Sequence, residues 1–472
     1  MQSPDPRLVR ASVRRPYGAM RIRPVFVGGA IVGLASSLCM VLVACIGDGP
    51  APVVNVPNDG AATDALVTPD SAGGDASVDA ADADSAVPTT YFDVTDVNNW
   101  SSYNLADTGA FGASALGFGG GVLAGKYIYL TPAPGASGNG IMFRYDTTAP
   151  FKTKSSWTTY DLKPTVDTTA GYQGAIFDGA NVFTFPYSDG KVARFDTTQS
   201  FVDSNAWKSY SLTSLYPASI GGGAFDGQYI YTTPFSTTAT VVRYDTKGAG
   251  FQASAAWSSF GLAAVDSALI YLNTPGFDKR YLYFPSADNS KVARFDTKSA
   301  FNASSSWDVM DTTTVSASMK GFSGGIFDGQ YIYFPPYHYD GSSVTVRYDT
   351  TKPYAQKTSW ETLDLTQVDA KASNLIGGTF DGRYVYYPPY SQGAVLVRYD
   401  TTKPFTQKTS WQSFGLANVT PNVAGYKGVV FDGEYIYLVP QAAADATPFV
   451  STIPRFHART PGSVPPIPPS FL

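Results

Sequence analysis

Residues 221–262 read GGGAFDGQYIYTTPFSTTATVVRYDTKGAGFQASAAWSSFGL, and this stretch contains the pattern of four short strands. Gly-rich apolar residues lead into Asp226-Gly227, a dipeptide that favours the two positive-φ positions of a type I′ hairpin turn. The aromatic and β-branched run 229–231 predicts the second strand. Residues 241–244 predict the third strand, and Trp257 lies in the fourth. We therefore expect a unit of four antiparallel strands.

Three motifs of this unit recur along the chain at a spacing of about fifty residues. They are a Trp, a Phe-Asp-Gly-x-Tyr-Ile-Tyr element with some looser copies, and an Arg-aromatic-Asp-Thr element with a degenerate last copy at 455–458. Each occurs seven times, which predicts seven repeats of one strand unit. The Trp residues are Trp100, Trp157, Trp207, Trp257, Trp307, Trp360 and Trp411; the second element begins at Leu123, Phe177, Phe225, Phe277, Phe327, Phe380 and Phe431; the third begins at Arg144, Arg194, Arg243, Arg294, Arg347, Arg398 and Arg455.

Seven units of four antiparallel strands predict an all-β fold, a seven-bladed β-propeller, in which radial packing leaves no long exposed sheet edge. The position at which the repeats begin and end along the chain predicts how the ring closes. Trp100 precedes the first unit, whereas the last unit, from Phe431 through Arg455, has no Trp of its own. We expect the segment around Trp100 to add the outer strand to the last blade.

The order of these motifs resembles the kelch repeat over residues 91–458. A Gly-rich strand, a Tyr-containing strand, Tyr-Asp and then a Trp follow one another in about fifty residues, as in kelch units. The double Gly that kelch units place after the Tyr is absent, and Pro-aromatic pairs such as Pro234-Phe235 stand there. The resemblance implies a propeller of the kelch type.

The N-terminal residues 1–44 have the pattern of a signal peptide. Six Arg precede an apolar run over residues 25–44, and the run ends in Leu42-Val43-Ala44-Cys45. That ending resembles the lipobox of bacterial lipoproteins, which implies cleavage, lipidation of Cys45 and a membrane-anchored protein of the cell envelope or cell surface. An uncleaved transmembrane helix and an ordinary cleaved signal are the alternatives, and Met20 is a plausible true start.

Residues 45–90 form an acidic segment that predicts a disordered linker. Residues 46–90 contain eight Asp and no Lys or Arg. The burial of their few apolar side chains would not offset the conformational entropy lost on ordering them. Their Asp spacing does not fit an EF-hand, and we expect no metal. The propeller itself is nearly neutral, which gives a nucleic-acid partner no electrostatic support. We expect a monomer without disulfides, since the two Cys residues are Cys39 and Cys45, and a Pro-rich, unpacked tail over 459–472.

Residues that recur in every unit are expected to be structural: each Trp packs against a neighbouring blade, and the Arg and Asp of one motif form a repeated hydrogen bond or ion pair. Binding residues are expected where the units differ, in the loops between strands two and three and between strand four and the next strand one. Aromatic rings beside hydrogen-bonding groups suit sugar rings or peptides. The alternatives are that the Pro-aromatic pairs pack between blades and that the lone His is solvated. The candidate ligand-binding residues are Tyr187, Asp189, Phe235, Asp288, Tyr337, His338, Tyr339, Asp340 and Tyr390.

The sequence offers few enzyme signatures. A copper-radical oxidase would need several ligand His and a Cys crosslinked to Tyr, and the chain has two His. No Ser/His/Asp constellation or phosphate-binding loop is recognised, so we assign no catalytic residue and no cofactor. We therefore expect a non-catalytic module that binds a protein or a glycan, attached to a membrane through lipidated Cys45. The alternative is a polysaccharide-active lyase or glycoside hydrolase, because paired carboxylates need no motif visible in sequence.

Overall fold

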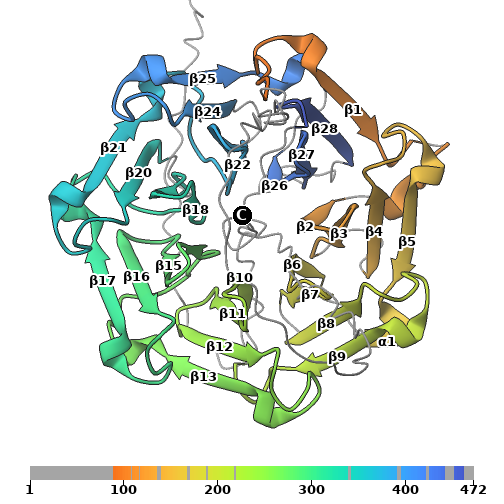
Figure 1. Ribbon diagram of the computed structural model, residues 1–472, viewed down its shortest axis with the longest axis horizontal. Helices are drawn as coiled ribbons and strands as arrows, with labels where there is room; N and C mark the ends of the chain where they lie inside the picture. The colour runs from red at the N-terminus through yellow and green to blue at the C-terminus, as the bar shows by residue number, and fades with distance from the viewer. Residues whose placement is uncertain are drawn as a thin grey trace, which may run out of the picture. The chain divides into compact units, whose positions relative to one another are not determined.

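The fold is a seven-bladed β-propeller in which every blade is a four-stranded antiparallel sheet (Figure 1). This confirms the predicted fold class. No helix in the described ranges is long and apolar enough to cross a membrane. The computed structural model describes residues 89–107, 109–115, 117–134, 140–166, 171–187, 190–216, 219–337, 342–390, 395–420, 425–441 and 451–461.

The strands of each blade follow one another outward from the axis in chain order, except in blade 7. Blade 1 contains β2 Phe118–Ala124, β3 Tyr127–Pro132, β4 Ile141–Asp146 and β5 Trp157–Asp161; blade 2 contains β6 Tyr172–Phe177, β7 Asn181–Pro186, β8 Lys191–Asp196 and β9 Trp207–Ser211; blade 3 contains β10 Ile220–Phe225, β11 Tyr229–Pro234, β12 Thr240–Asp245 and β13 Trp257–Gly261; blade 4 contains β14 Gly276–Phe277, β15 Tyr281–Pro285, β16 Lys291–Asp296 and β17 Trp307–Asp311.

The remaining three blades have the same arrangement of strands, and short helical turns flank the outer strands of the propeller. Blade 5 contains β18 Ile326–Phe327, β19 Tyr331–Phe334, β20 Val344–Asp349 and β21 Trp360–Asp364; blade 6 contains β22 Thr379–Phe380, β23 Tyr384–Tyr387, β24 Leu396–Asp400 and β25 Trp411–Phe414; blade 7 contains β26 Tyr426–Phe431, β27 Tyr435–Pro440, β28 Thr452–His457 and β1 Trp100–Asn104. The 3-10 turns are Val97–Asn99, Gly112–Ala115, Lys154–Ser156, Ser204–Ala206, Ser254–Ala256, Leu262–Ala264, Ser304–Ser306, Thr312–Thr314, Lys357–Ser359, Leu365–Gln367, Lys408–Ser410 and Leu416–Asn418, and α1 is Lys163–Val166.

The ring closes through the N-terminal strand, as the position of Trp100 predicted. β1 pairs antiparallel with β28, from Trp100 opposite Phe456 to Asn104 opposite Thr452. The closing blade is therefore completed by two segments from opposite ends of the propeller, lying side by side in Figure 1. Its third and fourth strands are joined by hydrogen bonds and by side-chain packing such as that of Trp100 on Phe456, because the chain does not connect them directly.

The turn between strands one and two differs from the prediction in its type. In blade 3 only Gly227, the first central residue, has a positive φ of 98°, which is the pattern of a type II′ turn rather than type I′. The Asp226 side chain replaces a backbone acceptor: its Oδ1 accepts the N–H groups of Gln228 and Tyr229 at 2.9 and 2.6 Å. Its Oδ2 accepts the Tyr231 hydroxyl at 2.8 Å. The motif therefore holds its own turn through the Asp and the second Tyr.

Each Trp of the ladder is structural, as predicted. The indole of Trp257 donates to the carbonyl of Phe251 at 2.9 Å, and its ring stacks on Tyr210 of the preceding blade at 4.7 Å with an interplanar angle of 3°. Five of the seven Trp contact a ring on the preceding blade's outer strand in this way; the pairs are Trp100–Phe414, Trp157–Tyr103, Trp207–Tyr160, Trp257–Tyr210 and Trp307–Phe260.

The repeated Arg residues are also structural, but they do not bond the Asp of their own motif as expected. The guanidinium of Arg243 lies 4.1 Å from the centre of the Tyr229 ring and 4.4 Å from that of Phe301 in the next blade. A cation between two aromatic faces ties the blades together. The motif's Asp245 instead accepts the N–H of Lys247 at 3.0 Å and closes the following turn.

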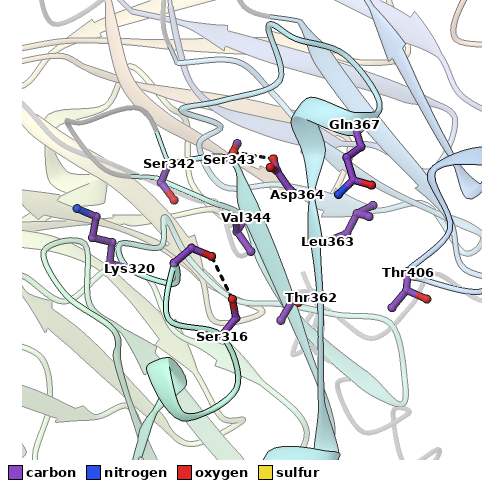
Figure 2. A pocket seen from close by; sticks show the side chains of 11 residues that line it. Ser316, Lys320, Ser342, Ser343, Val344, Thr362, Leu363, Asp364, Gln367 and Thr406 are labelled. Carbon is purple, nitrogen blue, oxygen red and sulfur yellow. Dashed lines mark hydrogen bonds between the residues drawn. The ribbon is translucent and has the colours of Figure 1, made fainter.

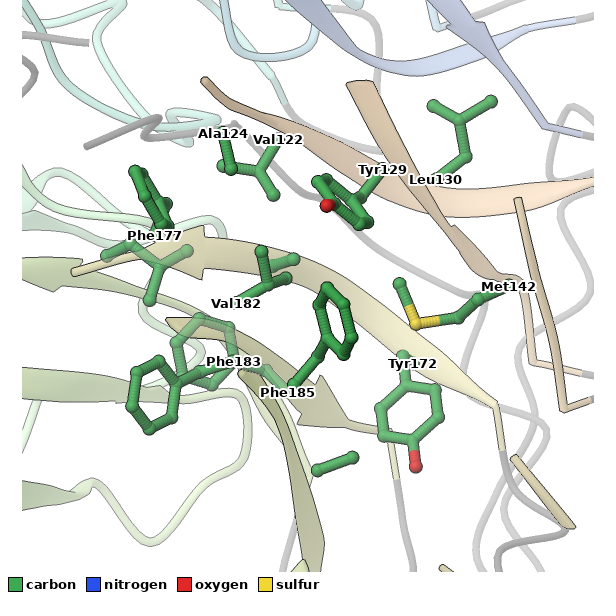
Figure 3. Packing of buried hydrophobic residues seen from close by; sticks show 14 of the residues in the cluster. Val122, Ala124, Tyr129, Leu130, Met142, Tyr172, Phe177, Val182, Phe183 and Phe185 are labelled. Atoms are coloured by element: carbon green, nitrogen blue, oxygen red, sulfur yellow. The ribbon is translucent and has the colours of Figure 1, made fainter. Parts of the chain in front are cut away.

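The core lies between blades, where aromatic and aliphatic side chains of neighbouring sheets interdigitate. Figure 3 shows Tyr129, Phe183 and Phe185 packed among aliphatic side chains of blades 1 and 2. The innermost strands approach each other so closely that Gly is required. A Cβ on Gly119 of β2 would lie 1.8 Å from the carbonyl oxygen of Tyr172 on β6 of the next blade.

The two ends of the propeller are joined beyond β1 and β28. Phe92 donates its N–H to the carbonyl of Ala458 at 3.0 Å, and its ring lies 4.0 Å from the imidazole of His457. His457 stands at the position of the motif Asp in the other blades, and its Nε2 is 3.2 Å from Glu434 Oε1. The seventh motif is degenerate because no chain turn follows this strand for an Asp to close; an aromatic sandwich with Tyr435 replaces it.

Candidate binding face

The connections between strands two and three and between strand four and the next strand one lie on one face, here called the loop face. In every blade a residue one to three positions after strand two donates its N–H to the carbonyl of a residue that leads into strand one. This hydrogen bond draws the two variable loops of each blade together. The seven pairs are Ala133–Gly117, Tyr187–Gly171, Phe235–Ser219, Ala287–Tyr271, Tyr337–Gly321, Tyr390–Asn374 and Gln441–Gly425.

Four predicted ligand-binding residues occupy this equivalent position after strand two. Phe235, Tyr337 and Tyr390 are 8%, 4% and 4% exposed and belong to one buried cluster. The rings of Tyr337 and Tyr390 meet edge to face at 5.4 Å across the boundary of blades 5 and 6. These rings therefore pack between blades, whereas Tyr187 is half-buried. Their role toward a ligand stays a prediction.

Of the other predicted residues, the structure describes Asp288. Asp288 is half-buried, and its N–H donates to Ser286 Oγ at 3.2 Å in a local turn. Asp189, His338, Tyr339, Asp340 and Cys45 lie outside the described residues, so their proposed roles stay predictions.

A polar pocket opens at blade 5. It has a volume of about 530 Å³ and is formed by the loop entering blade 5, the start of β20 and the end of β21. Figure 2 shows Lys320 at one side and Gln367 and Thr406 at the other, with hydroxyl groups between them. The lining residues are Ser316, Ser318, Lys320, Ser342, Ser343, Val344, Thr362, Leu363, Asp364, Gln367 and Thr406. We call this the blade 5 pocket.

Asp364 is the acidic group of the blade 5 pocket among its described lining residues. Its Oδ1 accepts the Ser343 hydroxyl at 2.8 Å, and the N–H and hydroxyl of Thr366 at 3.0 and 2.7 Å. Burial alone would raise the pKa of this carboxyl, but these hydrogen bonds bring its pKa below the usual value. Asp364 is therefore a fixed anion in the wall of the blade 5 pocket.

Blade 4 differs from blade 5 in the residue that lies opposite this carboxylate. The equivalent carboxylate, Asp311, is held in the same way by Ser290 at 2.7 Å. There Lys291 places its ammonium 3.3 Å from Asp311 and neutralises it. In blade 5 the position of Lys291 is taken by Val344, and in the described part of the chain no basic side chain forms an ion pair with Asp364.

The sequence did not single out the residues of the blade 5 pocket. Ser, Thr and Gln in turns are common, so none of them stands out alone. The signal is the exchange of Lys291 for Val344 opposite a retained Asp, and it becomes readable only when the strand register shows which residues face each other. In the described ranges, no three His, Cys, Asp or Glu side chains gather as a metal site would require.

No protein-family model matches the chain, and no curated protein matches its sequence. Among solved structures it is similar to virginiamycin B lyase from Staphylococcus aureus, with a TM-score of 0.52 and 14% sequence identity over 76% of this chain and 98% of the lyase chain. Propellers host both enzymes and binding modules. At this identity the likeness shows a shared propeller fold and nothing about activity.

Proposed function

We propose that this chain is an exported, lipid-anchored, kelch-like propeller that binds a glycan without catalysis, through the blade 5 pocket of its loop face. The observation that carries the proposal is the pocket's lining. It joins six Ser and Thr hydroxyls with an amide, an ammonium and one carboxylate in about 530 Å³. Sugar hydroxyls donate and accept hydrogen bonds at once, which suits such a mixture of groups.

The state of Asp364 favours binding over glycoside hydrolysis. Hydrolases of this kind use a pair of carboxyl groups, one of which has a raised pKa so that it can donate a proton. The pKa of Asp364 is lowered instead, and the described lining contains no second carboxyl group. An anion fixed by Ser343 and Thr366 is suited to accept hydrogen bonds from a ligand.

The paths of the chain ends agree with a tethered binding module. Arg459 donates to the carbonyl of Gly433, and Tyr91 packs edge to face on Tyr384, at the turns between strands one and two. These contacts lie on the face opposite the loop face. A linker from lipidated Cys45 would join the propeller there and leave the blade 5 pocket unobstructed.

A glycan array probed with the purified protein tests the proposal. We expect binding to a subset of glycans, and we expect Lys320→Ala/Gln367→Ala to weaken it by about tenfold or more, because two exposed hydrogen-bonding groups are lost at about 0.5–1.5 kcal/mol each. Calorimetry with the strongest glycan would measure the change.

The matched control is Asn418→Ala, which truncates the residue of the 416–418 turn that corresponds to Gln367 in the 365–367 turn. It should leave the affinity unchanged. Undiminished binding by the Lys320→Ala/Gln367→Ala protein would refute this pocket as the site. Cleavage of any bound glycan, followed by product analysis, would overturn the non-catalytic assignment in favour of a polysaccharide-active enzyme.

A further inference from the structure

A second pocket lies between blade 6 and the N-terminal residues 91–93, on the face opposite the loop face. It has a volume of about 310 Å³. Its walls come from the turn between β22 and β23, from the end of β24 with the turn that follows, and from the start of β25. We call it the blade 6 pocket. It shares no lining residue with the blade 5 pocket.

The boundary between blades 6 and 7 lacks an aromatic ring that the other boundaries share. In six blades the Trp indole donates to the carbonyl of an aromatic residue six positions earlier. That residue's ring lies 4.3–5.2 Å from the guanidinium of the preceding blade's motif Arg. In blade 7, Trp100 donates to Val94 instead. Arg398 therefore has no such ring, and its Nη1 donates to the carbonyl of Phe92 at 2.8 Å.

The side chain of Arg398 is a buried cation, only 3% exposed, without a carboxylate opposite it in the sheet. In blades 4 and 5 the residue opposite the motif Arg is Asp308 or Glu361, and each carboxylate is 2.6 Å from its guanidinium. In blade 6 the opposite residue is Gln412, whose neutral Oε1 accepts the N–H of Arg398 Nε at 2.7 Å.

Asp93 compensates this charge only in part. Its Oδ1 is 3.7 Å from Arg398 Nη2, which is longer than a hydrogen bond. The same oxygen accepts the N–H and the hydroxyl of Thr95, both at 2.9 Å, and the Asp93 side chain is 56% exposed. The close contacts of the buried guanidinium are thus made with neutral groups, and such a charge is more stable with a close counter-ion.

Two further cations share one carboxylate in the same pocket. Arg383 donates Nε and Nη2 to Asp400 at 3.2 and 2.9 Å, and Lys403 Nζ is 3.4 Å from that carboxylate. Burial alone would raise the pKa of Asp400, but hydrogen bonds from Arg383 and Thr402 lower it to about 2. The described lining therefore holds three cations and two carboxylates, an excess of one positive charge.

We propose that the blade 6 pocket binds a small organic carboxylate, of monosaccharide size or less, through Arg398, Arg383 and Lys403. A carboxylate supplies the missing negative charge, and its planar shape suits guanidinium groups. Arg383 and Lys403 are partly exposed, so a ligand reaches them from solvent. Tyr91 and Tyr384 add ring surface to the lining. The volume is at the lower end of that of ligand pockets, which restricts the ligand to a small molecule.

The test is thermal unfolding of the purified full chain in rising concentrations of acetate, glucuronate and galacturonate at constant ionic strength. Acetamide, glucose and galactose are the neutral counterparts. We expect at least one carboxylate to raise the Tm of the wild-type protein more than its neutral counterpart does. No difference within any of the three pairs would overturn the proposal.

Two variants lower the positive charge of the pocket without removing its buried Arg. Lys403→Gln removes one cation, and Gln412→Glu gives Arg398 the carboxylate that Glu361 provides in blade 5. Each should require roughly tenfold more carboxylate for the same increase in Tm. Without ligand, Gln412→Glu should keep at least the Tm of wild type, because the new carboxylate pairs with the guanidinium.

Lys352→Gln is the matched control. Lys352 is 3.1 Å from Asp349 in blade 5, as Lys403 is 3.4 Å from Asp400, and the two Lys side chains are about equally exposed. The control should keep the carboxylate response of wild type. An equal loss of response in Lys352→Gln and Lys403→Gln would show a general effect of charge and refute the site.

The same measurement separates this site from the blade 5 pocket. Lys320→Ala/Gln367→Ala should keep the difference between carboxylate and neutral counterpart. Loss of that difference in this variant, with retention in Gln412→Glu, would assign carboxylate binding to the blade 5 pocket and refute the blade 6 site. Loss of glycan binding on the array with an intact carboxylate response would leave the two sites independent, as proposed.

Discussion

At the scale of single residues, the hairpin turns show how one substitution stores strain. The first central residue of these turns has a positive φ, and the repeat places Gly there in most blades. Blade 4 places Lys279 there with a φ of 79°. An L-residue in this region carries a steric penalty of about 1–2 kcal/mol. Asp278 holds the turn in this conformation by accepting the N–H groups of Arg280 and Tyr281.

We therefore predict that Lys279→Gly stabilises the protein. The gain should be about 0.5–1 kcal/mol, because the relief of strain is partly offset by the greater entropy that Gly gives the unfolded chain. The measurement is the Tm or the urea midpoint. Lys279→Ala serves as the control, since it removes the side chain and keeps the strained φ. An equal gain in Lys279→Ala would show that the side chain, not the backbone, is responsible.

At the scale of elements, the sequence predicted the blades well because every strand carries its own local signal. The Phe-Asp-Gly element predicted the positions of strands one and two, and the Trp predicted the start of strand four. The predicted type I′ turn was wrong because the Asp-Gly preference reflects backbone conformation alone. In the structure the side-chain oxygen Oδ1 of Asp226 accepts the N–H of Tyr229. The residues of the blade 5 pocket were harder to predict because their properties depend on neighbours that are distant in sequence, as those of Asp364 depend on Val344.

Phe92 contacts His457 and Ala458 where the two ends of the propeller meet, and we call this contact the seam. It should make the stability of the protein depend on pH through His457. Burial between Phe92 and Tyr435 lowers the pKa of His457, although Glu434 works in the opposite direction and Arg455 adds to the lowering. A group with a lowered folded pKa takes up its proton more readily in the unfolded state. Stability is then fully present above the ordinary value of about 6.5 and is lost as the pH falls.

We predict that the wild-type protein loses more Tm between pH 7 and pH 5 than His457→Phe does, because Phe keeps the aromatic sandwich and cannot titrate. Asp381 contributes with the opposite sign: burial raises its pKa to about 6, so its contribution favours the folded state as the pH falls. That contribution is common to both proteins and cancels in the comparison. Equal pH dependence in the two proteins would exclude His457 as the titrating group.

At the scale of the whole molecule, the same Trp and Arg contacts between neighbouring blades recur around the ring. Only blade 7 has no chain connection between its strands three and four. In blades 1 to 6 a loosened outer strand stays tethered to strand three by the chain that connects the two strands. In blade 7, β1 is held to β28 by the ladder from Trp100 to Asn104 and by the seam around Phe92. Releasing it would restore the conformational freedom of a chain end, which favours opening at this blade.

We therefore predict that equal truncations in two blades have unequal local consequences. Trp100→Ala and Trp257→Ala each remove a buried indole that stacks on a ring of the preceding blade, at 4.8 Å on Phe414 and 4.7 Å on Tyr210. Each should cost about 3–5 kcal/mol in global stability. Hydrogen exchange should differ: in Trp100→Ala the amides of residues 452–457 should lose protection before those of other blades, because no chain connection holds β1 to β28. In Trp257→Ala the amides of β12 should keep protection closer to that of the whole ring, since the 246–256 connection holds β13 in place. Similar exchange at residues 452–457 in both variants would mean that the seam between Phe92 and Ala458, rather than β1, keeps the ring closed.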